Sequence, residues 1–219
     1  MDNADEVDAY SSAASQAYLD SIDNTVVDHV ISLGAQSGWL LDIGTGPGGI
    51  PLKIAERCPD LRAVGVDRSR RMIRTARNAA ARRGFGNRVS FMIADASRLC
   101  FPDACFDFVL SNSLLHHLKQ PVPVFEEMAR VSKPQGVILL RDLRRPARPV
   151  FLFHVRWFGR FYSGVMKKLY VDSVRSAYTE GELSDLLRPS ALANARVFRY
   201  SRTHLGFVRK GIGATHRVT

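Results

Sequence analysis

The chain has 219 residues, which is the size of one large domain and too short for two ordinary ones. Apolar residues make up 46% and charged residues 24%, so a packed core is expected and disorder throughout the chain is excluded. The formal charge is +10, and because residues 1–30 hold seven acids and no Lys or Arg, the other 189 residues carry +17. Such a field attracts phosphates, anionic lipid surfaces or acidic substrates, unless the arginines only solvate helix faces.

Membrane, secretion and metal signals are absent from the sequence. The most apolar late stretch, 150–165, is interrupted by His154, Arg156 and Arg160, so no transmembrane segment is predicted. The first residues are acidic where a secretory signal is basic. Three cysteines without a CxxC pair fit neither a disulfide framework nor a zinc site. We therefore expect a cytoplasmic protein without a bound metal.

Residues 1–38 carry apolar side chains at helical spacing and are predicted to form a helical arm that packs on a domain of residues 39–219. From residue 39 onward, short apolar runs typical of buried strands alternate with helical patterns. The predicted strands are 39–43, 61–66, 89–94, 106–111 and 137–140, with helices at 50–58, after Ser69 and at 122–131, and a turn at 133–136. This alternation predicts an α/β fold, a doubly wound, Rossmann-like and mostly parallel sheet between two helical layers.

Beyond Asp142 the alternation ends. Residues 147–175 are basic and aromatic and are expected to be helical. The sequence from Thr179 to Glu182 is a capping box that starts a helix reaching Leu187. Residues 196–200 and 204–209 then predict a terminal hairpin that gives the sheet an antiparallel edge.

A glycine-rich loop, Gly44-Thr45-Gly46-Pro47-Gly48-Gly49, separates the first predicted strand from a helix. Its backbone N–H groups and the helix N-terminus can face a ligand there, and the pattern alone is compatible with a dinucleotide. Asp42, two residues before the loop, favours a positively charged ligand group because it repels a pyrophosphate. Asp67 at the end of the next strand is suited to accept from two ribose hydroxyls, and Asp95 from an adenine amine.

The segments LLDIGTGPGG, VGVDRS, IADA, FDFVLSNSLLHHL and VSKPQGVILLRD resemble the successive motifs of class I S-adenosylmethionine-dependent methyltransferases, of the small-molecule type 11 group, over roughly residues 18–142. The resemblance implies S-adenosylmethionine as cofactor, S-adenosylhomocysteine as product, and the strand order 3-2-1-4-5-7-6 with an antiparallel seventh strand. The implied cofactor contacts run from the methionine end (Asp42, Gly44, Thr45, Gly46, Gly48) through the ribose and adenine (Asp67, Arg68, Asp95, Ala96) to the floor beneath the methyl group (Asn112, Ser113). Thr45 departs from the family, where cysteine is frequent.

Methyl transfer from a sulfonium is an in-line displacement, so the protein must mainly align the nucleophile and exclude water. A base is needed only if the acceptor has to lose a proton. His116 and His117 are the candidate bases, and because neighbouring helical residues point about 100° apart, at most one faces the site squarely. Asp142, at the end of the fifth strand, can orient an acceptor hydroxyl or amine. The alternative is that these residues only pack the loop.

The sequence leaves the acceptor open. No Asn/Asp-Pro-Pro-Tyr follows the fourth strand, which counts against exocyclic amines of bases. The main hypothesis is an enzyme that methylates a small molecule beneath a lid formed by residues 147–175. The alternatives are an RNA methyltransferase using its basic surface, an enzyme for a quinone-like or lipid-like acceptor with 147–175 in peripheral contact with a membrane, and a cofactor-binding protein without catalysis.

Overall fold

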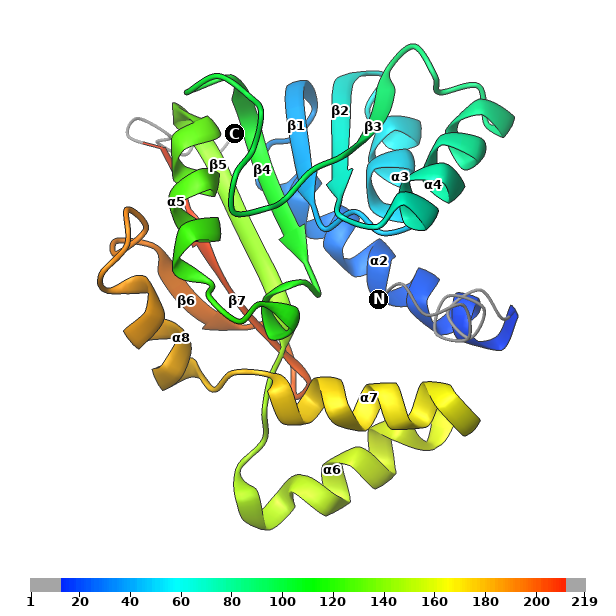
Figure 1. The fold of residues 1–219 in the computed structure, drawn as a ribbon, viewed down its shortest axis with the longest axis vertical. Helices are drawn as coiled ribbons and strands as arrows, with labels where there is room; N and C mark the ends of the chain where they lie inside the picture. Colours follow the sequence, from blue (N-terminus) through cyan, green and yellow to red (C-terminus); the bar gives the residue numbers. More distant parts are fainter. Residues whose placement is uncertain (1–12, 212–219) are drawn as a thin grey trace.

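The computed structural model describes residues 13–211, with side chains for 22–160 and 162–211 (Figure 1). The first half contains α2 (Ala13–Ser32), β1 (Ser37–Ile43), α3 (Gly49–Arg57), β2 (Asp60–Asp67), α4 (Arg70–Arg82), β3 (Val89–Ile93) and β4 (Phe106–Asn112). The second half contains η1 (Leu115–His117), α5 (Val122–Val131), β5 (Ser132–Leu143), η2 (Arg148–Val150), α6 (Phe151–Phe158), η3 (Gly159–Phe161), α7 (Gly164–Ser176), α8 (Glu180–Leu187), β6 (Arg196–Arg199) and β7 (His204–Arg209). The predicted helical arm corresponds to α2, while residues 1–12 lie outside the described part.

The seven strands form one sheet in the order β3-β2-β1-β4-β5-β7-β6. The pairs among β1 to β5 are parallel, whereas β7 runs antiparallel to both β5 and β6 (Figure 1). This confirms the predicted fold class, the strand order and the antiparallel terminal hairpin. Because the five parallel strands all point the same way, their carboxyl ends share one edge of the sheet.

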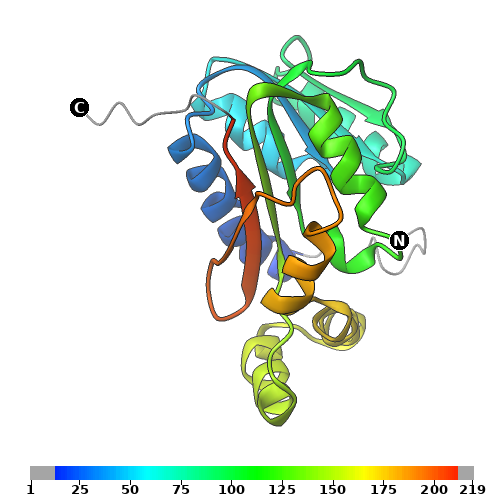
Figure 2. The ribbon, with the colours of Figure 1, turned by 90° about the vertical axis from the view of Figure 1, so that its left-hand side faces the viewer.

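Helices cover both faces of the sheet, which gives three layers (Figure 2). One core cluster joins α2, α3 and α4 to the sheet, with Val26, Val27 and Val30 of α2 all buried in it. The other cluster joins α5 and α8 to the opposite face around Phe125 and Phe207, whose rings meet edge to face at 5.6 Å. The sheet is therefore buried on both sides, which agrees with the nearly continuous apolar sequence of its short strands.

Capping residues predicted from the sequence set the starts of two helices. Ser69 accepts a hydrogen bond from Met72 N at the start of α4, and Thr179 and Glu182 form the predicted capping box of α8. The predicted turn at 133–136 is wrong, because β5 already begins at Ser132. The pairing of β5 with β4 changes register between Phe106 and Phe108 of β4. Residues 133–136 of β5 therefore form an irregular bulge inside a continuous strand and not a turn before it.

The basic aromatic segment folds into a helical hairpin of α6 and α7 that projects from the carboxyl edge of the sheet (Figures 1 and 2). The chain enters it from the end of β5 and leaves it toward α8. In the described range 13–211, no helix combines the length and the hydrophobicity that crossing a bilayer requires.

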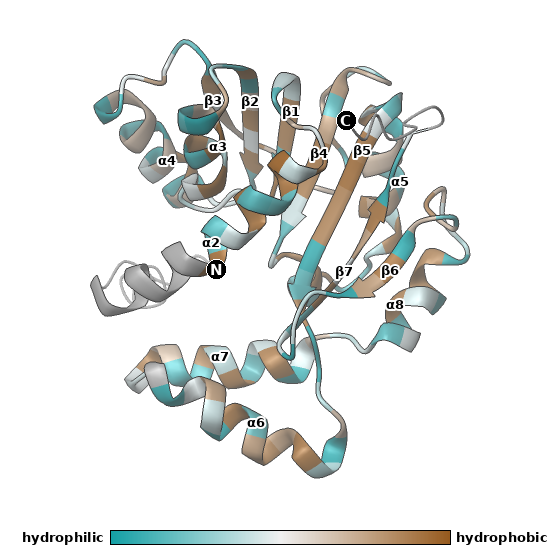
Figure 3. Cartoon of the chain, turned by 180° about the vertical axis from the view of Figure 1, so that it is seen from behind, coloured by the Kyte–Doolittle hydropathy of each residue, from teal (hydrophilic) through white to brown (hydrophobic). Residues whose placement is uncertain are grey.

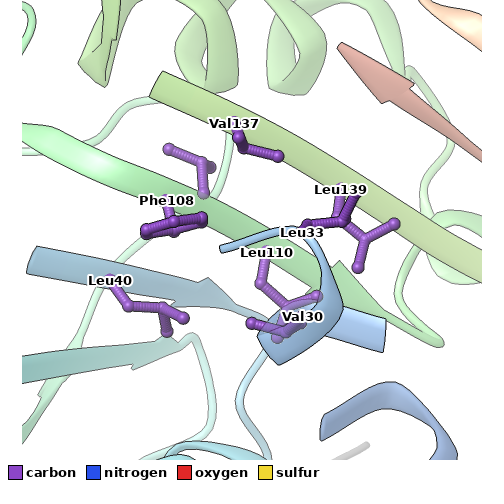
Figure 4. Close-up of a pocket in the computed structure, with 8 residues that line it drawn as sticks. Val30, Leu33, Leu40, Phe108, Leu110, Val137 and Leu139 are labelled. Carbon is purple, nitrogen blue, oxygen red and sulfur yellow. The ribbon is translucent and has the colours of Figure 1, made fainter. Parts of the chain in front are cut away.

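A small gap in the core lies between the end of α2 and the sheet (Figure 4). Only apolar side chains line it, from α2 and the loop after it, β1, β4 and β5: Val30, Leu33, Leu40, Phe108, Val109, Leu110, Val137 and Leu139. A site that recognises a polar ligand needs placed polar groups, so this gap is a packing feature of the core.

Gly206 sets the docking of β7 on β5. A Cβ at this position would stand 2.0 Å from Leu140 O, so β7 would have to move off β5. We expect Gly206→Ala to lower the free energy of unfolding by about 1–3 kcal/mol or more, as overpacking does. Gly181 in α8 is the matched control, because a Cβ added there would have no atom within 4 Å. Gly181→Ala should be neutral or stabilising by up to about 1 kcal/mol. Equal urea midpoints for both variants would contradict the close approach.

Candidate active site

The glycine loop bends around an open space at the carboxyl edge. Gly44 N and Thr45 N both donate to Val66 O, at 2.8 and 3.0 Å, which ties the loop to the end of β2. Gly44, Gly46 and Gly48 have φ of 78°, 53° and 83°, in the left-handed region that favours glycine. A Cβ at Gly48 would stand 2.6 Å from the Phe91 ring, whereas a Cβ at Gly46 would have no atom within 4 Å. Gly48 therefore serves packing, and Gly46 faces free space.

Asp42, at the end of β1, is a buried carboxyl group with one oxygen that no described residue pairs in good hydrogen-bond geometry. It is 1% exposed, and its Oδ2 is buried without a hydrogen bond within the described range. Burial, together with the negative charges of Asp23 and Asp67, raises the pKa of Asp42 to about 7, against the opposing effect of a hydrogen bond from the Thr45 side chain. Thr45 Oγ1 is likewise buried without a partner that meets hydrogen-bond geometry among those residues. Asp42 Oδ2 and Thr45 Oγ1 therefore keep hydrogen-bonding capacity that the described residues do not fully use.

Asp67, at the end of β2, is held by the backbone and retains acceptor capacity. Its Oδ2 accepts from Gly46 N at 3.0 Å and its Oδ1 from Ser69 N at 2.9 Å. A carboxylate has about four lone-pair positions, so about two remain for a ligand. Arg68, the next residue, is exposed. Asp67 thus has a fixed orientation and free acceptor positions.

Asp95 follows β3 at the same edge. It is exposed, and its Oδ1 accepts from Ser97 N at 2.9 Å and from Ser97 Oγ at 2.7 Å. These bonds, and the charge of Arg68, lower the pKa of Asp95, so it is an anion at neutral pH. Ala96 is half-buried beside it. The acids predicted at the ends of three strands therefore lie on neighbouring strands of one edge.

The end of β4 carries a strained residue and an unpaired amide. Ser113 has φ of 58°, one of two non-glycine residues with positive φ in the described part, and its N donates to Arg141 O at 2.9 Å. Asn112 Oδ1 is buried without a hydrogen-bond partner among the described residues. Strain and unsatisfied polar atoms of this kind concentrate at binding sites.

His116 and Asp142 form a buried pair at the ends of β4 and β5. His116 Nδ1 lies 2.6 Å from Asp142 Oδ1, and His116 N donates to Asp142 Oδ2 at 3.3 Å. Leu143 N also donates to Asp142 Oδ1, at 2.6 Å. A carboxylate accepts from an N–H, so Nδ1 holds the proton of the neutral ring and Nε2 keeps its lone pair. The carboxyl group of Asp142 is thus engaged by the histidine and by backbone.

His117 is placed differently, because residues 115–117 form a 3₁₀ turn and not the expected helix. It is exposed, and its ring lies 4.0 Å from that of His116 at a tilt of 44°. Partial burial, and then His116, lower the pKa of His117, so it is neutral near pH 7. Within the described residues, His116 is the one of the two candidate bases that pairs with a carboxylate.

Sequence reasoning missed His204, on β7. It pairs in register with Leu143 and is buried, and burial lowers its pKa to about 3. Its charge interactions include Asp142 and His116, so it lies behind the pair as a neutral group. The predicted hairpin placed His204 next to β5, but a single histidine in an edge strand carries no signal of its own.

Three comparisons with known proteins bear on this geometry. Residues 41–140 match the family model described as "Methyltransferase domain". The chain is 31% identical over 166 residues to the demethylmenaquinone methyltransferase of Roseiflexus castenholzii, covering 68% of this chain and 67% of that relative. It is 33% identical over 111 residues to the ajmaline N-methyltransferase of Rauvolfia serpentina, covering 50% of this chain and 38% of that relative. The chain belongs to the class I S-adenosylmethionine-dependent methyltransferases.

The fold of this methyltransferase also matches solved structures. The PH0226 protein from Pyrococcus horikoshii superposes with a TM-score of 0.69 at 20% identity, covering 93% of this chain and 95% of that one. The cofactor of the family, S-adenosylmethionine, carries an ammonium and a sulfonium group. The unpartnered Asp42 carboxyl, the open space at Gly46 and the free acceptor positions on Asp67 fit a cationic nucleoside. The residues present are therefore compatible with the cofactor that the family uses.

Gly46 provides a direct test of the loop in this methyltransferase. Gly46→Val should lower the affinity for S-adenosylhomocysteine at least about tenfold, because the side chain would fill the space left for the ligand. Gly84, after α4, is the matched control, with φ of +72° and nothing within 4 Å of the place its Cβ would take. Gly84→Val should carry a similar left-handed strain of about 1–2 kcal/mol without losing affinity. Titration calorimetry distinguishes them, and unchanged binding by Gly46→Val would make the loop a structural turn.

Asp42 predicts an unusual pH dependence of stability. The pKa of about 7 in the folded protein lies above the ordinary value of 3.8, so between these values the folded state binds more protons than the unfolded chain. The contribution of Asp42 to the stability of the ligand-free protein should therefore fall as pH rises from about 4 to about 7. Buried neutral histidines such as His204 contribute in the opposite direction, so the effect is read from the difference between the parent and Asp42→Asn. Asp42→Asn removes this loss and should stabilise the ligand-free protein at pH 8 by about 1–3 kcal/mol, while weakening its stabilisation by the cofactor.

Urea unfolding at pH 5 and pH 8 measures the effect. Asp60→Asn, at the exposed start of β2, is the control and should leave the pH dependence unchanged. A loss of stability at pH 8 in Asp42→Asn would mean that the carboxylate has a protein partner.

Proposed function

We propose that this methyltransferase methylates a small molecule whose nucleophilic atom becomes reactive when a hydroxyl group of the same molecule loses a proton to His116. The observation that carries the proposal is the buried His116–Asp142 pair, with 2.6 Å between Nδ1 and Oδ1, at the carboxyl edge near Asn112 and Ser113. An oriented imidazole with a free Nε2 lone pair is suited to act as a general base.

In the proposed cofactor site, Asp42 faces the positive end of the cofactor, Asp67 accepts from the ribose hydroxyls, and Asn112 lies beneath the methyl group. The glycines Gly44, Gly46 and Gly48 with Thr45 line the methionine end, and Arg68, Asp95 and Ala96 line the adenine end. When bound, S-adenosylmethionine supplies an electrophilic methyl group and takes back the electron pair of the broken carbon–sulfur bond. The positive charge near Asp42 favours its ionised form, which offsets the effect of burial on this carboxyl group.

In the proposed step, His116 Nε2 takes a proton from a hydroxyl of the acceptor. The electron pair released into the acceptor forms the new bond to the methyl carbon. The imidazolium that results is stabilised by the Asp142 carboxylate, which also fixes the ring so that Nε2 and not Nδ1 accepts the proton. Asp142 is therefore proposed as a positioning residue rather than as a partner of the acceptor.

The proposed acceptor class is a hydroxylated aromatic ring of the quinol type. Loss of a hydroxyl proton makes the carbon beside it electron-rich, and a base is needed for that step. After this carbon has accepted the methyl group, it loses its own hydrogen as a proton and the ring oxygen is protonated again, which restores the aromatic ring. The Roseiflexus castenholzii relative is named a demethylmenaquinone methyltransferase. The α7 helix packs against η1, which carries His116, and so provides a wall over the acceptor. We propose the α6–α7 hairpin as the lid of the site.

We further propose that the reaction takes place in the cytoplasm. All three cysteines are free thiols, with Cys58 buried and Cys100 exposed, which suits a reducing compartment. The proposal requires no metal, and within the described residues no group of three or more His, Cys, Asp or Glu side chains is placed to hold one.

Replacing the histidines one at a time tests the proposal. His116→Gln should lower kcat by about 10²–10⁴-fold with little change in cofactor affinity, because a general base contributes about that factor. His117→Gln, the adjacent exposed position, should keep a kcat near the parent value. Release of S-adenosylhomocysteine with a short-chain hydroxyquinol measures both. If His117→Gln is the variant that loses turnover, the base is assigned to the wrong residue.

Two further measurements test the roles of Asp142 and His116, namely the kcat of Asp142→Asn and the pH–rate profile of His116→Gln. Asp142→Asn should lower kcat because the amide can donate to Nδ1 and leave the proton on Nε2. In His116→Gln, the residual activity should lose the acidic limb of the pH–rate profile. An unchanged acidic limb would show that another group accepts the proton.

A further inference from the structure

The outward face of α6 concentrates the exposed apolar surface of the molecule. Five of the seven large apolar side chains that the described part of the chain exposes lie within residues 150–165. The most exposed are Leu152 at 78%, Phe153 at 66% and Trp157 at 52%. The opposite face of α6 is covered, with His154 and Val155 buried. A contiguous apolar face of this kind marks an interaction surface.

The two aromatic side chains of this face support one another. The rings of Phe153 and Trp157 stack with centroids 5.9 Å apart and an angle of 17° between their planes. The Arg160 guanidinium lies 4.4 Å from the Trp157 ring centroid, and its Nη1 donates to Trp157 O at 3.0 Å. The face is therefore an ordered apolar surface with a positive charge at its rim.

The α6–α7 hairpin is strongly basic. Residues 147–176 contain six Lys and Arg and a single acid, Asp172, which pairs with Arg175. On α6 itself, Arg156 is exposed between Leu152 and Trp157 in the sequence. Apolar and aromatic side chains flanked by basic ones are the composition of helices that lie in the interface of anionic membranes.

The position of α6 in the fold suits such a contact. Figures 1 and 2 place α6 at the end of the molecule farthest from the sheet, with α7 between it and the body. Figure 3 shows apolar residues along this outermost helix. α7 packs on η1 and α6 packs on α7, so the outward face of α6 does not cover the site. It is free to meet a flat surface.

We propose that the outward face of α6, formed by Val150, Leu152, Phe153, Arg156, Trp157 and Arg160, docks on an anionic phospholipid bilayer. Apolar side chains would enter the acyl boundary while the arginines contact lipid phosphates. Aliphatic Leu152 and Val150 contribute nothing to stacking on nucleic-acid bases, and Phe153 and Trp157 stack on each other, so the surface favours lipid over RNA. The inference does not depend on the acceptor, but it would place the site next to a lipid-borne substrate.

The tryptophan content allows a site-specific test. Trp39 and Trp157 are the only tryptophans, and both are exposed with an arginine over the ring, Arg62 over Trp39 at 5.6 Å. Trp39→Phe leaves Trp157 as the single emitter, and Trp157→Phe leaves Trp39 on β1 as the matched control. Each variant is titrated, without cofactor or acceptor, with vesicles of phosphatidylcholine alone or with phosphatidylglycerol.

On phosphatidylglycerol vesicles, the emission of Trp157 should shift to shorter wavelengths and be quenched by brominated acyl chains, while that of Trp39 should not change. Binding should weaken with salt, and Arg156→Glu with Arg160→Glu should weaken it at least about tenfold. Because no turnover is measured, failure of the proposed reaction would leave this result unaffected.

Three outcomes would overturn the docking proposal. The first is Trp157 emission that no vesicle changes. The second is emission that responds to RNA and not to lipid, which would make the face a nucleic-acid surface. The third is emission that responds to a short-chain acceptor without vesicles and not to lipid, which would make the outward face of α6 an acceptor-binding surface instead of a membrane contact.

Discussion

The parallel pairing of β1 between β2 and β4 is the interaction on which the rest of the structure depends. It brings Asp42 into register with Gly65 on one side and Leu110 on the other, so that neighbouring strands end at one edge. The glycine loop is tied to Val66 at the same edge. Without this register, side chains from five separate stretches of sequence would not share a site. Most of the candidate site residues lie where a parallel strand ends.

Two buried carboxyl groups at this edge have opposite roles. Asp142 is 1% exposed and is fully engaged, by the His116 ring and by backbone N–H groups. Asp42 is equally buried, yet its Oδ2 has no partner in the described part of the chain. Burial of a polar group is tolerated when it is hydrogen-bonded and costs free energy otherwise. The Asp142 carboxyl group is therefore stabilised by its hydrogen bonds within the fold. The Asp42 carboxyl group instead destabilises the ligand-free protein, and a cationic ligand would offset this effect.

The sequence predicted the sheet, its order, the glycine loop and the edge acids because each follows from short-range patterns with fixed periods. The sequence did not show which of His116 and His117 faces Asp142. The orientation of each ring depends on the 3₁₀ turn that follows Ser113, a residue with positive φ. The sequence assigned a turn to 133–136, because Pro134 and Gly136 serve a bulge as readily as a turn. It also did not reveal the outward face of α6, because apolar residues occur on both sides of that helix.

The pairing of His204 with Leu143 makes the wall behind the histidine–carboxylate pair a product of the last strand in the chain. A nascent chain that has reached α8 already contains the glycine loop and the pair itself. At that stage β5 is an unprotected edge strand, and the side of the site that β7 closes is open to water. The glycine loop and the parallel strands beside it can therefore form before β7 joins the sheet during synthesis.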